Sequence, residues 1–533
     1  MKIKFKMFVA IAVSMLMCCS TMALVGCGNK GNQDLENSDV LNIVMPDLGY
    51  GTDGMKALAS AFTEKTGIKT NVDVTPTDSG YNTAIRSGAA PYDIYLTRDN
   101  TYSLVTANAA NYSGKDVVIA CLDDVYEAEV ADEGVKFKDK MKDMYEVYNR
   151  VDAKGNGENH YYAVQWCDSI FSFVRNLDVW NSSWGTPNTT DELLDVCKKM
   201  KVSGVTPMIW SSQAPYVWYT ACLWATQYQG LEDMYGDTGF WNAYSISGEK
   251  NSPKMWQREG ILYALEILDE LVNSKNKYSH VTSTSVDFTT AQGYFLLPSQ
   301  KIAMMSNGDW LYKEMVKNYS NARIEMFRTP VVSKIKDHPD CEGTIENDAE
   351  LSALIDAIDA GSTALTGKGY SVSQKAFDKV KEARTMYSCG SNINHVMISP
   401  AYSDSLDLVK KFYNFLASDE GLAIYARSSG GFTLPFGISD SVKAASDAVA
   451  NDYVKSSESI KQSCQVAPWP MYSSRLFSVG NMPVNPVIEM GYGFPELILS
   501  LDKGYKNAGT IYSENYRNAV NKWSSFMTTA GLG

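Results

Sequence analysis

The order strand, helix, strand near the start of the chain is the feature that most limits its fold. Leu41 to Met45 is an apolar run of strand length, and apolar residues then recur at helical spacing between Met55 and Phe62. Gly67 follows as a helix terminator, and residues 68–74 alternate as a second strand. A helix joined to two strands by short connections predicts a parallel βαβ unit, and therefore an α/β fold.

A third strand extends this unit. A short helix is predicted at 81–87 and a strand at 93–96, which runs into a polar loop. Ligands of open α/β sheets bind beyond the carboxyl ends of the strands, where the loops after the first and third strands lie. Helix caps and surface turns would explain each of these side chains taken singly. The loop residues in question are Asp47, Tyr50, Arg98 and Asp99.

Length and charge narrow the class of protein. The chain has 533 residues, of which 45% are hydrophobic, and this is enough for a large core and at least two domains. Its formal net charge of −13 argues against binding to nucleic acid or to anionic lipid. All eleven tryptophans lie at or beyond Trp166. A site that uses indoles therefore belongs to the later part of the chain.

The amino end has the pattern of an export signal. Three lysines within the first six residues precede an apolar run from Met7 to Met17, which predicts a signal peptide over residues 1–26. Its last residues and the next, Leu24-Val25-Gly26-Cys27, resemble the bacterial lipobox, whose cysteine becomes lipidated. Cys27 would then anchor the protein to the extracellular face of the membrane, with residues 27–39 as a flexible tether. Ordinary cleavage nearby, with Cys27 incidental, is the alternative.

Patterns typical of catalysis and metal binding are missing. The seven cysteines after Cys27 include no CxxC pair, which argues against a disulfide framework, although a bridge between Cys341 and Cys389 stays open. None of the four histidines is spaced as a metal pair or set beside a nucleophile motif. We therefore predict no metal, no cofactor and no catalytic residue. Two carboxylates far apart in the sequence could still form a glycoside hydrolase site.

Three tryptophans are candidates for a binding site. Trp166 stands in a β-rich run over 161–176, which is long enough to cross from one domain to another. Trp210 ends a predicted strand, and Trp310 follows a turn after the apolar run 301–305. An indole is a good platform for the apolar face of a sugar ring, but packing in the core is the alternative for each of them.

Three longer patches, together with the lipobox, carry a resemblance to a known family. They are Ser87 to Ile94, Gln300 to Trp310 and Phe412 to Pro435. The chain resembles the solute-binding lipoproteins of bacterial ATP-binding-cassette importers, of the class that includes maltodextrin-binding proteins. The likeness spans nearly the whole chain after the signal peptide.

This resemblance implies a two-lobed fold of the periplasmic-binding-protein type, type II, with the ligand cleft between the lobes. Lobe one would hold residues 40–166 and 393–435, and lobe two would hold residues 167–392 and 436–533. The loop residues Asp47, Tyr50, Arg98 and Asp99 would line lobe one, and Trp166 would lie at the crossing between lobes. The remaining ligand-binding residues implied by the resemblance are Trp210, Trp310 and Tyr492.

The predicted function is that of a receptor without catalytic activity. It would bind a carbohydrate, an oligosaccharide, outside the cell as a monomer and deliver it to the permease subunits of an ATP-binding-cassette importer. A secreted glycoside hydrolase and a lipoprotein receptor for a peptide or another solute are the alternatives.

Overall fold

The computed structural model describes ten segments of the chain. They are residues 40–98, 101–105, 117–131, 133–152, 158–213, 216–363, 372–390, 394–469, 476–477 and 494–533. All belong to a compact unit that begins at Asp39. Five predicted features, namely the signal peptide, Cys27, the tether over residues 27–39, Asp99 and Tyr492, lie outside the described residues. Within the described residues, no helix is both long enough and apolar enough to cross a membrane.

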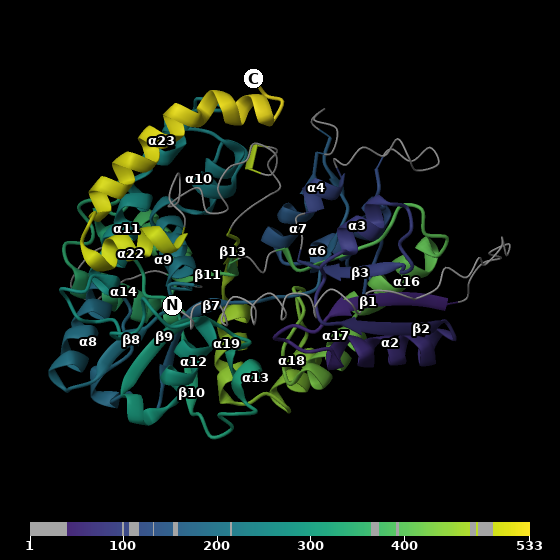
Figure 1. Ribbon diagram of the computed structural model, residues 1–533, viewed down its shortest axis with the longest axis horizontal. Coiled ribbons are helices and arrows are strands. Elements are labelled where there is room, and N and C mark those ends of the chain that lie inside the picture. The colour runs from purple at the N-terminus through teal and green to yellow at the C-terminus, as the bar shows by residue number, and fades with distance from the viewer. Residues whose placement is uncertain are drawn as a thin grey trace, which may run out of the picture. The chain divides into compact units, whose positions relative to one another are not determined.

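The first sheet has the strand order β2-β1-β3-β12-β6. β1 pairs in parallel with both β2 and β3, whereas β12 runs antiparallel to its two neighbours, β3 and β6. The parallel pairs confirm the predicted βαβ unit (Figure 1). The strands are β1 (Val40–Pro46), β2 (Lys69–Thr75), β3 (Ile94–Thr97), β6 (Val164–Gln165) and β12 (Val396–Ile398).

Helices from two distant parts of the sequence cover this sheet. α2 (Asp53–Thr66) joins β1 to β2, buries its apolar side from Met55 to Phe62 and ends at Gly67. Gly67 has a φ of 75°, the left-handed conformation that glycine adopts without strain. α16 (Leu406–Ala417) and α17 (Asp419–Ser429) pack against α2, and the ring of Phe412 meets that of Phe62 edge-on at 5.4 Å.

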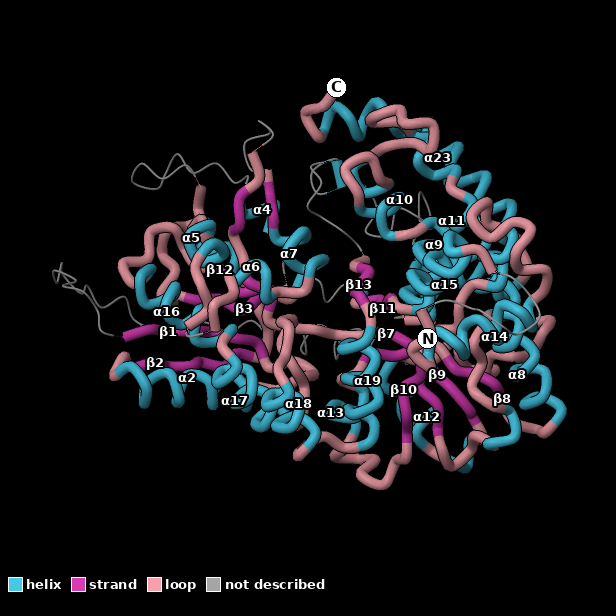
Figure 2. Tube along the Cα trace, turned by 180° about the vertical axis from the view of Figure 1, so that it is seen from behind, coloured by secondary structure: helices cyan, strands magenta, loops and turns pink. Residues whose placement is uncertain are grey.

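The second sheet has the strand order β13-β11-β7-β9-β8, and β10 also pairs with β7 (Figure 2). Its centre is antiparallel, because β7 pairs with β9 and β10 in that sense, while β8 runs parallel to β9. The strands are β7 (Phe171–Asn176), β8 (Thr206–Ile209), β9 (Ile302–Gly308), β10 (Ile324–Phe327), β11 (Met386–Ser388) and β13 (Gln465–Ala467).

One run of sequence links the two sheets, as predicted for residues 161–176. β6 lies in the first sheet and β7 in the second, so residues 166–170 pass between them. The strand that contains most of the apolar run 301–305 is longer than that run. It continues to Gly308, because Ser306 to Gly308 pair with β7.

Helix α9 (Val217–Gln229) forms the core behind the second sheet. It packs against α11 (Glu259–Val272), nearly all of its residues are buried, and its sequence has no charged side chain. Trp224 on this helix is fully buried and donates a hydrogen bond to the carbonyl of Pro330 at 3.0 Å, so it is a core residue. The last helix, α23 (Ala508–Thr529), packs against α11.

The other elements are short or peripheral. Around the first sheet they are α3 (Tyr81–Arg86), α4 (Thr101–Val105), α5 (Asp123–Glu127), α6 (Phe137–Lys140), α7 (Asp143–Asn149), β4 (Arg150–Val151) and β5 (His160–Tyr161). Later in the chain they are α8 (Thr190–Val202), α10 (Leu231–Tyr235), α12 (Phe288–Leu296), α13 (Leu311–Met315), α14 (Asp348–Asp359), α15 (Gln374–Arg384), α18 (Asp440–Asp447), α19 (Asp452–Ser463) and α22 (Phe494–Lys503).

None of the seven cysteines after residue 27 forms a disulfide. Cys341 and Cys389 are both buried and no disulfide joins them, so the bridge that the sequence left open does not form. A core of this size needs no covalent support.

Candidate functional site

A pocket of about 280 Å³ lies where the loops of the first sheet meet the end of β9. We call it the Trp310 pocket. It brings together residues that are up to 347 positions apart in the sequence, from Leu48 to His395. Its lining consists of Leu48, Gly49, Tyr50, Arg98, Tyr216, Trp310, Glu314, Asn394 and His395.

Trp310 is held in place by β9 and by rings around it. Its indole folds back over the end of the strand, and a Cβ on Gly308 would come within 2.1 Å of the ring, so only glycine fits there. Phe171 and Tyr216 meet the indole edge-on, with ring centroids at 4.8 and 6.0 Å. Trp310 is only 6% exposed. It is therefore both a packed residue and a part of the pocket wall.

The loop after β1 lies directly against Trp310. The ring of Tyr50 approaches the indole edge-on at 5.9 Å, and a Cβ on Gly49 would lie 3.1 Å from it. The hydroxyl of Tyr50 donates a hydrogen bond to Asp309 Oδ1 at 2.5 Å. Burial, together with the neighbouring Asp309 carboxylate, raises the pKa of Tyr50 well above its usual range. Tyr50 is therefore a neutral donor that connects the first sheet to the second.

Arg98 reaches the pocket from the loop after β3. Its guanidinium pairs with the carboxylate of Asp78, with Nη2 2.6 Å from Oδ1 and Nε 3.1 Å from Oδ2. Burial acts to raise the pKa of Asp78, but the hydrogen bonds and charge of Arg98 outweigh it and lower that pKa. Asp78 thus orients an arginine that is itself 43% exposed at its side chain.

The other predicted site residues lie in different places. Asp47 is exposed beside the pocket and is not part of its lining. Trp166 is buried behind the lining residue His395, with ring centroids at 5.5 Å, and its indole N–H has no hydrogen-bond partner among the described residues. Trp210 is buried in the packing of the second sheet, where its Nε1 donates to Ser279 Oγ at 2.7 Å. The structure places Trp210 outside the Trp310 pocket.

Six lining residues were not predicted from the sequence: Leu48, Gly49, Tyr216, Glu314, Asn394 and His395. A signal existed for Glu314, because it stands four positions after Trp310 and so shares its side of a helical turn; its N–H donates to the carbonyl of Trp310 at 3.0 Å. Partial desolvation raises the pKa of its carboxyl, although the hydrogen bond from Gln292 opposes this rise. Asn394 and His395 precede β12 and gave no local signal.

A buried group of charges lies on the other side of residue 309. Lys461 Nζ is 3.0 Å from Asp309 Oδ2 and 2.5 Å from Glu458 Oε1, and the Lys461 and Asp309 side chains are fully buried. Burial raises the pKa of Asp309 to about 6 in spite of the Lys461 charge. Burial also acts to lower the pKa of Lys461, but Glu458 and the nearby carboxylates outweigh it and raise that pKa. The ammonium therefore stays charged.

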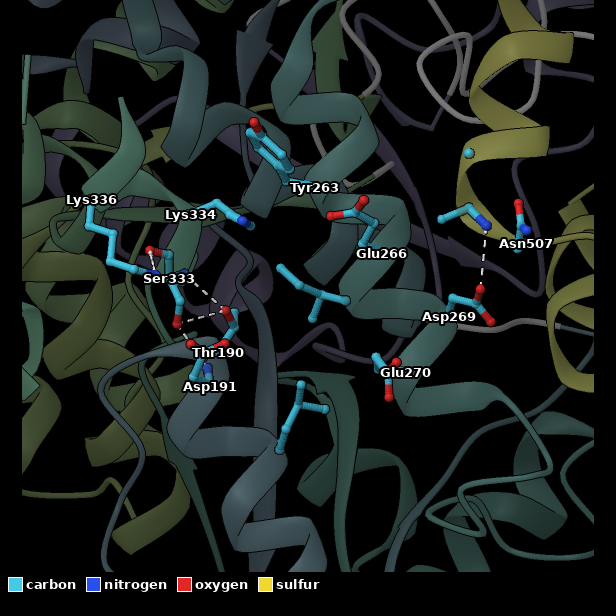
Figure 3. A pocket seen from close by; sticks show the side chains of 14 residues that line it. Thr190, Asp191, Tyr263, Glu266, Asp269, Glu270, Ser333, Lys334, Lys336 and Asn507 are labelled. Atoms are coloured by element: carbon cyan, nitrogen blue, oxygen red, sulfur yellow. Dashed lines mark hydrogen bonds between the residues drawn. The ribbon is translucent and has the colours of Figure 1, made fainter. Parts of the chain in front are cut away.

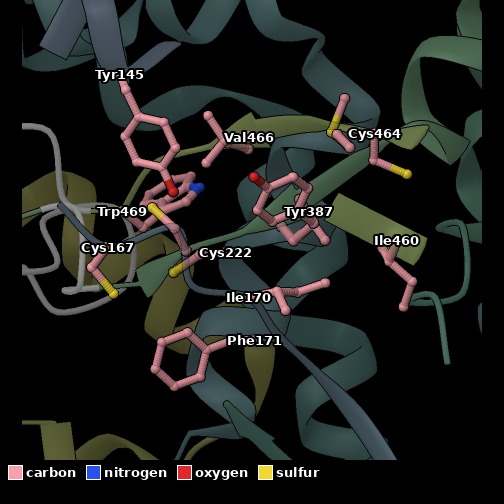
Figure 4. Packing of buried hydrophobic residues seen from close by; sticks show 14 of the residues in the cluster. Tyr145, Cys167, Ile170, Phe171, Cys222, Tyr387, Ile460, Cys464, Val466 and Trp469 are labelled. Atoms are coloured by element: carbon pink, nitrogen blue, oxygen red, sulfur yellow. The ribbon is translucent and has the colours of Figure 1, made fainter. Parts of the chain in front are cut away.

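The same group extends to the link between the sheets through Asp168. Its carboxylate pairs with Lys142 and accepts hydrogen bonds from Tyr145 at 2.9 Å and Tyr387 at 2.6 Å. Figure 4 shows these two tyrosines among the buried residues around them. Lys461 donates to the carbonyl of Asp168 at 2.6 Å. Burial acts to raise the pKa of Asp168, but the two lysines outweigh it and lower that pKa. We call the set Asp168, Asp309, Lys142, Glu458 and Lys461 the Lys461 network.

A larger cavity of about 660 Å³ lies between α8, α11 and the start of α23 (Figure 3). Some polar groups of its wall already form hydrogen bonds with one another. The N–H of Ala508 donates to Asp269 Oδ2 at 3.3 Å, and the N–H of Ser333 donates to Thr190 Oγ1 at 2.9 Å. Tyr263 is the one aromatic residue among its lining. We favour the smaller Trp310 pocket as the ligand site, because it alone of the two combines several rings with both signs of charge.

Metal-binding side chains do not converge in the Trp310 pocket within the described part of the chain. A converging set of three lies outside the pocket, at the start of α5 and on β5.

The chain is similar to known binding proteins. The family model described as bacterial extracellular solute-binding protein matches residues 49–423. A crystal structure of a candidate binding protein, MsmE of Bacillus subtilis subsp. subtilis strain 168, in an open conformation, is 14% identical, covering 91% of this chain and 98% of its own. The TM-score is 0.49, and we base no argument on that likeness. No curated protein matches the chain.

Proposed function

Because the chain belongs to the bacterial extracellular solute-binding proteins, we propose that it binds a carbohydrate outside the cell and delivers it to an ATP-binding-cassette permease. Proteins of this family bind solutes for import and are generally non-enzymatic. Membership of the family indicates that a solute is bound, and we add to it that the solute is a carbohydrate and that the permease is of the ATP-binding-cassette kind.

The observation that carries the proposal is the mixture of groups in the Trp310 pocket. Trp310 and Tyr216 supply ring surface, while Arg98, Glu314 and Asn394 supply donors and acceptors. A sugar has apolar C–H faces and a rim of hydroxyl groups, so it needs both kinds of contact at once. A peptide receptor would instead need extended backbone partners, such as a free strand edge. The composition of the pocket therefore favours a sugar.

The size of the pocket bears on the length of the ligand. At about 280 Å³ it is slightly smaller than the roughly 300–1,000 Å³ typical of small-molecule sites. It suits one or two sugar rings when the first sheet lies against Trp310 as it does here. We propose that it takes the end of an oligosaccharide, with Trp166 supporting His395 from behind.

The lining supports binding between two lobes. Tyr50, Arg98 and His395 come from the first sheet and its loops, whereas Tyr216 and Trp310 come from the second. We propose lobes of residues 40–166 with 393–435, and 167–392 with 436–533. A ligand held by both would favour the closed form, and the permease could then select that form by its outer surface. Scattering should show compaction when sugar is added.

Anchoring completes the proposed arrangement. Lipidation at Cys27, as predicted from the lipobox, would hold a monomer at the extracellular face of the membrane beside the permease. Labelling with a radioactive fatty acid should mark the unaltered chain and leave Cys27→Ala unmarked.

A thermal-shift panel of oligosaccharides and peptides tests the proposal. A rise in melting temperature with one class of oligosaccharide, confirmed by calorimetric titration, is the expected result. A response to peptides alone would replace the carbohydrate by a peptide. Sustained release of shorter sugars during incubation would instead favour the glycoside hydrolase.

A further inference from the structure

Three side chains with metal-binding atoms meet at the surface near the first sheet. In the part of the chain that the structure describes, Cys121, Asp123 and His160 form the one such group of three, and their donor atoms all lie within 4.8 Å of one another. Asp123 is the first residue of α5, and His160 is the first residue of β5. None of the three lines the Trp310 pocket, so the binding of sugar leaves them unexplained.

The backbone fixes this arrangement. The N–H of Leu122 donates to the carbonyl of Tyr161 at 2.7 Å, which places the two segments side by side. Asp123 Oδ1 accepts a hydrogen bond from the N–H of Tyr161 at 2.9 Å, and its other oxygen lies 2.7 Å from His160 Nδ1. One oxygen therefore orients the carboxylate while the other faces the histidine. Orientation of this kind is what a metal site requires of its ligands.

The donors are one sulfur, one nitrogen and one oxygen, a combination that suits zinc. Zinc accepts all three at about 2.0–2.3 Å in a tetrahedron, and this places neighbouring donors roughly 3–4 Å apart. Magnesium and calcium prefer oxygen alone and are disfavoured by the thiol. The side chains of His160 and Asp123 are 39% and 42% exposed, so they have room to move by the roughly 1 Å that brings the donors to these separations. We propose that Cys121, Asp123 and His160 bind a zinc ion, with water in the fourth position.

A second set of the same residue types provides a matched control. His338, Asp340 and Cys341 lie within four positions of each other in the sequence, closer than the proposed ligands. Cys341 is fully buried, and Nδ1 of His338 accepts the N–H of Asp340 at 3.2 Å. These three residues do not form a converging group among the described residues. Composition alone therefore does not produce the proposed site.

Titration with metal ions tests the proposal. The protein is freed of metal with a chelator, then titrated with zinc chloride by calorimetry and with cobalt chloride by absorption spectroscopy. We expect a single ion per chain and, with cobalt, a thiolate-to-metal charge-transfer band. Cys121→Ser should abolish the band. His160→Gln, which can still donate to Asp123, should weaken zinc binding by more than about tenfold, and His338→Gln should leave it unchanged.

A second measurement uses the unaltered protein and does not depend on how the variants fold. Cys121 is the exposed cysteine among the seven that the structure describes, so an alkylating reagent should modify it first. Zinc should slow that reaction, and mass spectrometry of digested protein locates it. The proposal would be overturned by an alkylation rate at Cys121 that zinc does not change, or by zinc binding that does not saturate at one ion per chain. A cobalt charge-transfer band that persists in Cys121→Ser would overturn it as well.

Discussion

Asp309 and Trp310 are consecutive residues that serve two different regions. Trp310 is surrounded by rings in edge-on contact and forms a wall of the pocket. Asp309 turns the other way, into the Lys461 network, where it contacts buried charges and the hydroxyl of Tyr50. The pocket thus depends on many weak contacts, each of about 0.5–1.5 kcal/mol, whereas the network depends on a few buried charges.

This difference separates binding from stability. Truncating a ring in the pocket loses packing contacts but leaves no buried charge without a partner. Removing one charge from the network leaves the opposite charge buried and uncompensated. Tyr50 takes part in both regions, because its ring contacts Trp310 and its hydroxyl contacts Asp309. We therefore expect substitutions to sort into those that weaken ligand binding and those that affect folding alone.

The largest expected effect is that of Lys461→Met. It leaves Asp309 and Glu458 as neighbouring buried carboxylates, and we expect a loss of about 3–5 kcal/mol in the free energy of unfolding. Urea denaturation measures it. Lys455→Met on the same helix is the control, because Lys455 is exposed and should change stability by less than about 0.5 kcal/mol. Equal stability of the two variants would show that the network contributes nothing net.

Tyr50→Phe should have the next largest effect. It removes the hydrogen bond to Asp309 and keeps the ring contacts with Trp310 and Phe432. A hydrogen bond to a charged group contributes about 1.5–3 kcal/mol, and we expect a loss of that size in thermal or urea unfolding. Tyr505→Phe, at a tyrosine that is 77% exposed, is the control. If Tyr50→Phe and the unaltered protein unfold with the same free energy in the absence of sugar, the hydrogen bond from Tyr50 to Asp309 forms only when the two lobes close on the ligand.

Trp310→Ala tests the pocket directly. We expect the affinity for sugar to fall by roughly ten- to thirtyfold, which corresponds to about 1.4–2 kcal/mol, because ring stacking on the ligand is lost. Both indoles are buried, so Trp310→Ala and Trp210→Ala should each lower the melting temperature, but Trp210→Ala should leave the affinity unchanged, since Trp210 lies outside the pocket. Calorimetric titration and thermal melting of both variants decide this. Unchanged affinity of Trp310→Ala would contradict the assignment of the pocket.

The smallest expected effect is a dependence on pH. The pKa of Asp309 is about 6 in the folded protein against 3.8 as its ordinary value, so the folded state holds this proton more tightly than the unfolded chain. The contribution of Asp309 to stability is thus greatest below pH 3.8 and is lost as the pH rises through 6. Relative to Asp309→Asn, the unaltered protein should lose about 2 kcal/mol between pH 4 and 7, which is less than about 1 kcal/mol for each pH unit. A gain over that range would show that Lys461 keeps the carboxylate ionised throughout.

Local sequence signals predicted much of the fold but only part of the site. The apolar spacing from Met55 to Phe62 and the stop at Gly67 predicted α2 correctly. Trp210 and Trp310, however, both follow strands of the same sheet, β8 and β9, and their local sequences gave equal reason to expect a role in binding. The turn after Gly308 directs one indole to the pocket, while Trp210 packs beside Ser279.

The sequence by itself determined the parallel βαβ unit, the link between two sheets through residues 166–170, and the family to which the chain belongs. Only the tertiary structure decided that Asp309 meets Lys461, 152 positions later, and that His395 joins Arg98 in one pocket. The same holds for Cys121 and His160 at the proposed zinc site. The physical reason is that hydrophobic periodicity and helix-terminating residues act on neighbours in the sequence. Contacts between distant side chains depend instead on how whole helices and strands pack.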